Sequence, residues 1–282
     1  MIQRLISECE EKACTARLSR LLGVSRSGVY AACRRGQAAR HAPLAGSVLA
    51  AFQASGGNYG SRRVSAALKA QGLAVGRCRT RRLMREQGLK ARWRRKFVHT
   101  TNSRHDLPVA DNILDRQFKP DAPDRAWVAD ITYIRTARGW LYLAAVMDLY
   151  SRKVVGWAMA PTMPAELVCE ALKMAIDLRQ PAAGLIVHSD RGSQYAGHLY
   201  QALLKQHQLI PSMSRRANCW DNAVMERFFL NLKMERVWQR SYANHSEAIT
   251  DINQYIVAFY NTQRLHSTLG YQSPADYEKA AA

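Results

Sequence analysis

Apolar and polar residues between 124 and 237 alternate in short blocks whose period changes several times along the chain. Three apolar runs joined by short turns come first, and a helical period then begins at Pro164, a residue that suits the first turn of a helix. The pattern predicts strands at 127–134, 140–148, 153–160, 185–189 and 209–213, and helices at 164–179, at 197–208 and around Glu226. This order predicts an α/β domain built on a mixed sheet.

The first 105 residues have a helical pattern that glycines interrupt. Residues 13–35 read as two helices with a turn at Gly23, after which Ser25 suits an N-cap. Helices are also predicted at 43–55, 61–71 and 77–88, with Ser61 as the cap of the middle one. Both groups fit a helix-turn-helix unit, although ordinary helical hairpins share the pattern.

Composition then suggests the domain boundaries. We expect a helix-turn-helix-like segment at 1–45, a second such DNA-binding domain at 46–105, a polar linker at 106–123, the α/β core at 124–237 and a helical tail at 238–282. The tail has one predicted helix at 246–260, capped by Ser246. Asn261, Arg264 and His266 follow it in a polar loop, where they either pack the helix onto the core or touch DNA.

Charge is concentrated in the amino-terminal part. The chain carries 41 Lys and Arg against 22 Asp and Glu, and residues 1–120 hold 24 of the former but only 7 of the latter. The predicted helix at 77–88 is too rich in arginine to be buried. These features favour a surface for the phosphate backbone of DNA, against a basic helix that touches nothing. The candidate DNA contacts are Arg62, Arg63, Arg77, Arg79, Arg81, Arg82 and Arg85.

Six cysteines form no Cys-x-x-Cys pair, and the eight histidines do not combine with them at zinc-binding spacing. Reduced thiols are therefore expected. The amino-terminus is too charged for a signal peptide, and no stretch approaches the roughly 20 apolar residues of a membrane span. We therefore expect a cytoplasmic protein without a membrane partner.

Three acidic residues carry the candidate chemistry. Asp130 interrupts an apolar strand, Asp190 ends another, and Glu226 lies on the last predicted helix after a gap of 35 residues. A lone aspartate is more often a turn, a cap or a paired surface charge. However, an ionised carboxylate inside an apolar strand needs a cation or hydrogen-bond donors. Three converging carboxylates can hold two divalent cations at a phosphorus centre, the chemistry of cutting and joining DNA.

Several longer strings carry a family resemblance. They are Trp-Val-Ala-Asp-Ile-Thr-Tyr-Ile at 127–134, His-Ser-Asp-Arg-Gly-Ser-Gln-Tyr at 188–195, Asn-Cys-Trp-Asp-Asn-Ala-Val-Met-Glu-Arg-Phe-Phe at 218–229, and the tail from Tyr260 to Pro274. Together they resemble the insertion-sequence transposases of the IS3 type, in which a second reading frame encodes an Asp-Asp-35-Glu domain related to retroviral integrases. The resemblance runs from about residue 45 to the carboxyl terminus.

The resemblance implies a ribonuclease-H-like, five-stranded mixed sheet with flanking helices. It also implies catalysis by Asp130, Asp190 and Glu226 with two Mg²⁺ ions, for which Mn²⁺ can substitute. The substrates would be double-stranded DNA, both element ends and target. A homo-oligomer and cooperation or fusion with an upstream reading-frame product are implied as well. A ribonuclease-H-type nuclease and a DNA-binding regulator with a decayed core stay as alternatives.

The helix around Glu226 holds further candidates. Asn218 is expected to cap it, and Trp220 is expected on its apolar, core-facing side. Asn222 and Lys233 share a face with Glu226 and are candidate DNA contacts, Lys233 by position in integrase-like enzymes.

Three other polar residues are rivals for the site, and each has a structural alternative. Glu235 projects to the opposite side of the helix from Glu226, so we expect it to pair with an arginine or with the tail. We expect Asp148 to serve a turn or to pair with Arg152. His188 is expected in the core.

Overall fold

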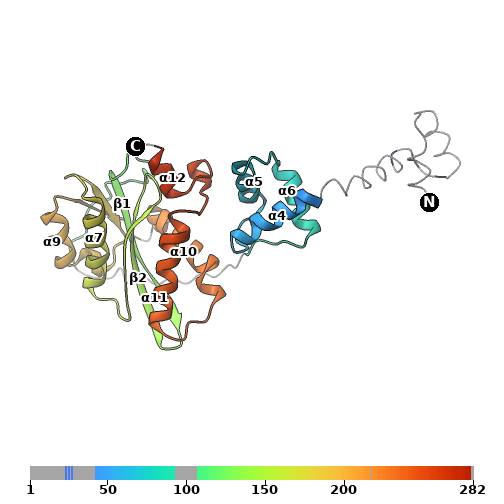
Figure 1. Cartoon of the computed structure of the whole chain (residues 1–282). Helices are drawn as coiled ribbons and strands as arrows, with labels where there is room; N and C mark the ends of the chain where they lie inside the picture. Colours follow the sequence, from blue (N-terminus) through green and yellow to red (C-terminus); the bar gives the residue numbers. More distant parts are fainter. Residues whose placement is uncertain are drawn as a thin grey trace. The chain divides into compact units, whose positions relative to one another are not determined.

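The computed structural model describes residues 42–92, 107–216 and 218–280, together with Gly23, Ser25 and Ser27 (Figure 1). The predicted first helix-turn-helix segment lies almost entirely outside these residues. Contacts divide the chain into a first unit, Met1–Ala91, and a second unit, Arg92–Ala282.

The described part of the first unit contains three helices, as predicted: α4 (Ala42–Ala54), α5 (Ser61–Ala70) and α6 (Arg77–Glu86). They enclose a small core that includes Val48, Val64, Leu68 and Leu83. Ser61 is the first residue of α5 rather than its cap, and Gly60 precedes it without a side-chain cap. The Gly60 carbonyl instead accepts a hydrogen bond from the Val64 N–H.

The second unit is built on one five-stranded sheet with the order β3-β2-β1-β4-β5. Its strands are β1 (Ala126–Thr136), β2 (Gly139–Asp148), β3 (Val154–Ala160), β4 (Ile186–Ser189) and β5 (Ile210–Met213). The first three pair antiparallel, while β4 pairs parallel with both β1 and β5. The sheet is therefore mixed, with the element order that the sequence predicted.

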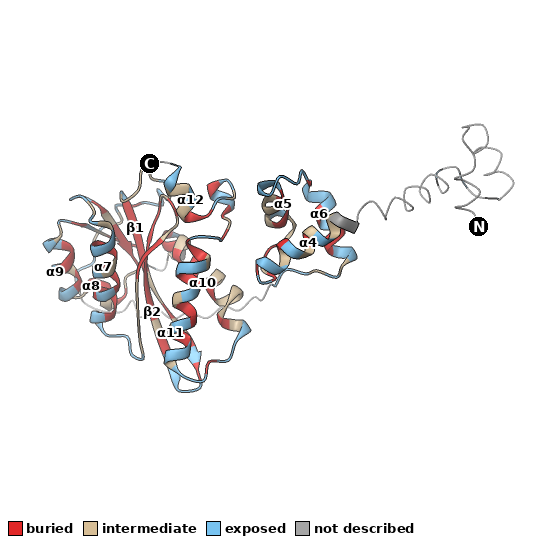
Figure 2. Ribbon diagram, viewed as in Figure 1, coloured by how far each residue is buried: buried red, intermediate tan, exposed pale blue. Residues whose placement is uncertain are grey.

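Helices cover both faces of this sheet (Figures 1 and 2). Residues alternate along β1, so that Trp127 and Ala129 belong to one apolar cluster and Val128 to the other. The first cluster contains α7 (Ala165–Arg179), α8 (Ser193–Ala196) and α9 (His198–Gln206); the second contains α10 (Ala223–Glu235). A Cβ on Gly156 of β3 would stand 2.2 Å from the Ala171 carbonyl oxygen, so only glycine allows α7 this close to the sheet.

The carboxyl-terminal residues belong to the same core as α10. The helix α11 (His245–Gln254) runs into a π-helical turn, Tyr255–Tyr260, and α12 (Pro274–Lys279) ends the described chain. Ile252, Ile256 and Tyr260 pack in the α10 cluster. Asn244, not Ser246, caps α11, because its side chain accepts the Glu247 N–H. The predicted tail helix is thus present, but α12 was not predicted.

Two residues of the polar loop that follows this helix pack the tail onto the core. The Asn261 side chain accepts the Val154 N–H and donates to the Val154 carbonyl, so it extends the edge of β3. The Arg264 guanidinium donates to both carboxylate oxygens of Glu235 at 2.7 and 2.8 Å, with both side chains buried. Of the two roles left open by the sequence, packing is the one the structure shows for this pair.

The segment 107–123, predicted as a linker, also contacts the second unit. Leu114 is buried in the α10 cluster, and the backbone N–H groups of Ile113 and Leu114 donate to Ser212 Oγ. The segments before and after residues 124–237 therefore both pack against the sheet domain.

Within the part of the chain that the structure describes, no helix combines the length and apolar character that crossing a bilayer requires. Cys78 and Cys169 are unpaired thiols, the first exposed and the second buried.

Glu235→Gln should lower the free energy of unfolding of the full chain by about 3 kcal/mol, because it leaves the buried Arg264 guanidinium without its counter-charge. Urea denaturation followed by tryptophan fluorescence measures this. The matched control is Glu170→Gln on the exposed side of α7, expected to change the same quantity by less than about 0.5 kcal/mol. Equal effects of the two substitutions would contradict the role given to the pair.

Candidate active site

The register of two parallel strands places Asp130 and Asp190 level with each other. The pairing of β1 with β4 ends at Val128 and His188, and each aspartate lies two residues beyond that last pair. Parallel strands run about 4.8 Å apart and have their carboxyl ends on the same side. The two carboxylates therefore meet where the strands stop pairing, at the edge where open α/β sheets place their sites.

Each carboxylate is held by a nearby backbone group. Asp130 Oδ1 accepts the Ile131 N–H at 2.7 Å, and Asp190 Oδ1 accepts the Gly192 N–H at 2.9 Å. Burial raises the pKa of Asp130 well above its ordinary value, and the charges of Asp190 and Glu226 raise it further. The Ile131 N–H and the Lys233 ammonium offset part of this shift. The three predicted acids therefore act on one another electrostatically.

A side-chain hydrogen bond connects the start of α10 to β1. Asn222 Nδ2 donates to the Ala129 carbonyl at 3.2 Å, at the point where β1 has no further pairing with β4. Glu226 follows one turn later, exposed and in the first turn of α10, where the partial positive charge of the helix amino-terminus favours a carboxylate. Asn222 is buried, and its bond to β1 brings the helix of Glu226 to the edge that carries Asp130.

Lys233 lies two turns further along α10. Its ammonium stands 4.5 Å from the ring centroid of Tyr133, a cation–π contact with a residue of β1. Burial lowers the pKa of Lys233, while the negative charge of Asp130 raises it. The lysine therefore places a positive charge beside the carboxylates.

The predicted cap of this helix is wrong. Asn218 makes no capping hydrogen bond, and a short 3₁₀ turn, Cys219–Asn222, comes before α10. The Asp221 carboxylate within this turn accepts hydrogen bonds from Arg116, Arg215 and Asn112. Arg215 and Arg116 hold the pKa of Asp221 well below its usual range, so it is a buried, ionised anchor.

The rival polar residues have structural partners. Glu235 pairs with Arg264 and accepts the Tyr255 hydroxyl, as predicted for a structural acid. Asp148 accepts the Tyr150 N–H at the β2–β3 turn, and its ionic partner is Arg179 instead of the predicted Arg152.

His188 is fully buried between the hydroxyls of Ser212 and Ser214, which confirms the expectation of a core histidine. Burial lowers the pKa of His188 to about 4, so the ring is neutral.

Two buried polar atoms beside the carboxylates, the Tyr195 hydroxyl and Asn222 Oδ1, have no hydrogen-bond partner among the residues that the structure describes. Burial raises the pKa of Tyr195, and the charges of Asp130 and Asp190 add to that effect, so its hydroxyl lies near both. Buried polar groups normally have partners. Unsatisfied oxygens next to acidic side chains fit a site that is completed by hydrated cations.

The ligand set is not assembled around one point. In residues 42–92, 107–216 and 218–280, no three His, Cys, Asp or Glu side chains stand close enough together to hold one metal ion. Asp130 and Asp190 each direct an oxygen to a backbone N–H instead. Rotation of these side chains about the Cα–Cβ bond is what would release those oxygens.

The candidate DNA contacts of the first unit lie mainly on α6. This helix buries Thr80, Leu83 and Met84. The exposed arginines around that buried stripe are Arg77, Arg79, Arg81, Arg82 and Arg85. On α5, Arg62 is exposed, while the Arg63 guanidinium lies 5.5 Å from the Tyr59 ring centroid. The arginines thus surround a helix whose remaining face holds the three-helix core, and their contact with DNA stays a prediction.

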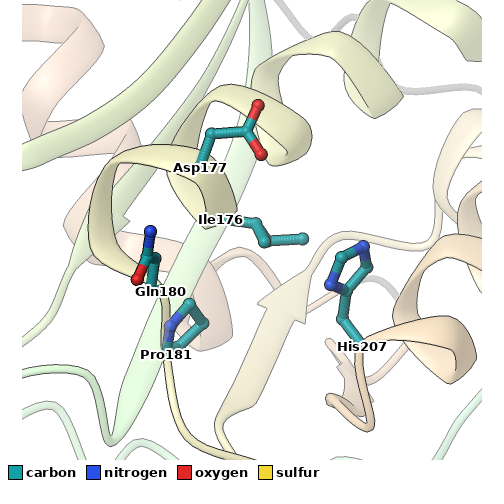
Figure 3. Close-up of a pocket in the computed structure, with 5 residues that line it drawn as sticks. All are labelled: Ile176, Asp177, Gln180, Pro181 and His207. Atoms are coloured by element: carbon teal, nitrogen blue, oxygen red, sulfur yellow. The ribbon is translucent and has the colours of Figure 1, made fainter.

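A hollow of about 450 Å³ lies away from the carboxylates, at the ends of α7 and α9 (Figure 3). It is lined by Ile176, Asp177, Gln180, Pro181 and His207. None of the predicted site residues lines it, so the candidate chemistry belongs to the open sheet edge and not to a closed cavity.

Proteins of bacterial insertion sequences align with nearly the whole chain. "Transposase InsF for insertion sequence IS3A" of Escherichia coli K12 is 41% identical over 268 residues, which are 93% of this chain and 92% of that protein. The chain belongs to the IS3-type transposases. An insertion element IS600 31 kDa protein of Shigella sonnei is 44% identical over 93% of this chain and 97% of its own length. The activity of this transposase is DNA transposition.

Family models divide the transposase as its structure does. An integrase core domain model matches residues 120–219 and a second integrase core model matches residues 207–274, so the family core includes α10 and most of the tail. An HTH-like domain model matches residues 40–97. Among solved structures, the HTLV-2 integrase catalytic core domain in complex with magnesium aligns with 57% of this chain and 99% of its own, with 15% identity and a TM-score of 0.46.

Gly192→Ala should lower DNA joining by the transposase about tenfold, because small displacements in a site are costly. The added Cβ would stand 3.0 Å from Asp190 Oδ1 and 3.1 Å from Gln194 Oε1, so the turn that carries Asp190 would have to shift. The backbone of Gly192 has an ordinary negative φ, so the fold should persist. Ser193→Ala in the same loop is the control and should join DNA at the wild-type rate. Joining by Gly192→Ala at the control rate would show that Asp190 is not position-sensitive.

Proposed function

We propose that this transposase cuts DNA at the ends of its insertion sequence and transfers the resulting 3′-hydroxyl to a phosphodiester of the target. Asp130, Asp190 and Glu226 would hold two Mg²⁺ ions, with Mn²⁺ able to substitute. The observation that carries the proposal is the strand register, in which Asp130 and Asp190 follow the same last pair of β1 and β4.

Both reactions displace an oxygen at phosphorus. In the first, a water oxygen forms a bond to phosphorus and the bond to the 3′ oxygen breaks, which leaves a 3′-hydroxyl and a 5′-phosphate. In the second, that 3′ oxygen forms a bond to a target phosphorus and gives up its proton, and the bond from this phosphorus to the target's 3′ oxygen breaks, which leaves a 3′-hydroxyl on the target strand. Two divalent cations, when bound, activate the attacking oxygen and stabilise the leaving one. Neither step requires a covalent protein–DNA intermediate, so no serine or tyrosine nucleophile is assigned.

The residues of the chain would bind the cations and orient the DNA. Asp130, Asp190 and Glu226 would hold the cations once the two aspartates leave the Ile131 and Gly192 N–H groups. Bound cations would also remove the mutual repulsion that raises the Asp130 pKa. Lys233 would bind a phosphate of the DNA end, since its ammonium already lies beside the carboxylates. Asn222, at the start of α10, would contribute to the same contact with the DNA end.

The first unit would select and hold the DNA. Its HTH-like match and the exposed arginines of α6 support binding of the terminal inverted repeats. The contacts proposed there are Arg62, Arg63, Arg77, Arg79, Arg81, Arg82 and Arg85. Joining of two DNA ends to one target requires two sites, so we propose a homo-oligomer, with an upstream reading-frame product as a further partner.

Asp130→Asn, Asp190→Asn and Glu226→Gln should each lower cutting and joining by at least about 100-fold in Mg²⁺, because each keeps the side-chain volume but removes a ligand charge. Gel assays with labelled terminal-repeat duplexes measure both products. Asp177→Asn, an exposed acid of α7, is the matched control and should retain full activity.

The same assay separates the proposal from its alternatives. A ribonuclease-H-type nuclease would cut without joining, and a regulator with a decayed core would bind the duplex but do neither. If one member of the triad retained near-normal joining after substitution, that residue would leave the proposed ligand set.

Arg81→Ala combined with Arg82→Ala should weaken binding of a terminal-repeat duplex and lower the slope of log Kd against log salt by about 2, because two phosphate contacts no longer release counterions. Lys173→Ala combined with Lys205→Ala removes the same charge from exposed positions on α7 and α9. The double variant of Lys173 and Lys205 should leave the slope unchanged. An equal change of slope in both double variants would show that Arg81 and Arg82 of α6 are not specific DNA contacts.

A further inference from the structure

Trp220 is exposed where the sequence predicted a core residue. Its side chain keeps 69% of its surface open to solvent, more than Leu178 on α7 at 62% or Leu199 at 55%. A tryptophan has a very large apolar surface, and here most of it is within reach of a ligand. The helical period predicted the core because it assumed that α10 begins at Asn218, whereas Trp220 lies in the 3₁₀ turn before that helix.

The backbone on one side of this tryptophan is firmly held. Asp221 is fully buried and accepts hydrogen bonds from Arg215, Arg116 and Asn112 at 2.8–3.0 Å. Asn222 is buried and donates to the Ala129 carbonyl. The indole is therefore attached to a turn whose backbone is already fixed. Binding of a ligand to it would cost little further backbone conformational entropy.

The turn lies at the candidate active site, and arginines flank it in sequence. Its Asn222 contacts the residue before Asp130, and Glu226 follows one helical turn later. Two exposed arginines lie close in sequence on either side, Arg216 and Arg227, in addition to Arg215, which pairs with Asp221. An aromatic side chain among arginines, next to carboxylates that act on DNA, is the combination that proteins use for a nucleic acid strand with unstacked bases.

We propose that Trp220 stacks on an unpaired nucleobase at the DNA end held by Asp130, Asp190 and Glu226. The proposal rests on the function proposed above. The base must be unpaired, because a base inside the duplex has both faces covered by its neighbours. Stacking would keep the terminal base pair open and hold the strand while the scissile phosphate lies at the carboxylates.

An abasic-site scan tests the proposal. Wild-type enzyme and Trp220→Ala are assayed for joining on duplexes of the element's terminal repeat in which each of the last few nucleotides, on either strand, is replaced by an abasic one. On the intact duplex, Trp220→Ala should join about tenfold more slowly, whereas Trp220→Phe should stay close to wild type. At one position, the abasic nucleotide should slow the wild type by a similar factor and leave Trp220→Ala unchanged.

Controls separate this proposal from the underlying function. Leu178→Ala removes a comparably exposed apolar side chain from α7 and should join like the wild type at every position. If Trp220→Ala and the wild type are slowed equally by every abasic nucleotide, or if Trp220→Ala joins the intact duplex at the wild-type rate, stacking is wrong. If the wild type itself neither cuts nor joins the intact duplex, the proposed function fails first.

Discussion

The parallel pairing of β1 with β4 is the constraint on which the site depends. Only three residue pairs join these strands, and two aspartates follow the last of them at the same distance. The backbone thereby forces two like charges together, and burial with mutual repulsion raises the Asp130 pKa. That arrangement is costly for the protein alone, and the cations of the proposed function would lower its energy.

Much of the remaining second unit keeps this register rigid. His188 at the last pair is fixed between two hydroxyls of the chain around β5, and Asn222 closes the free edge of β1. Behind α10, the buried Glu235–Arg264 pair fixes the helix to the carboxyl-terminal chain. Glu235 is thereby engaged by Arg264, whereas Glu226 of the same helix is exposed.

The sequence predicted the parts of this account that depend on local pattern. Alternation and helical period located the five strands along the chain, and the spacing of Asp130, Asp190 and Glu226 identified acids that the structure brings into electrostatic contact. Helix starts were less predictable, because Asn244 displaces Ser246 as a cap and a 3₁₀ turn precedes α10.

Partners distant in sequence could not be predicted from pattern at all. Arg116 reaches Asp221 across 105 residues, and Asn261 reaches Val154 across 107. Such pairs connect the segment before residue 124 and the tail to the sheet domain. Local periodicity contains no information about which distant side chain will satisfy a buried charge.

The most direct test of the central claim is the position of bound metal. Crystals of the transposase grown with Mn²⁺ and terminal-repeat DNA would locate the ions by anomalous scattering. We expect two peaks about 4 Å apart, each about 2.1 Å from carboxylate oxygens of Asp130, Asp190 or Glu226. Peaks bound instead by Glu235, or in the hollow beside Asp177 and His207, with none between Asp130 and Asp190, would contradict it.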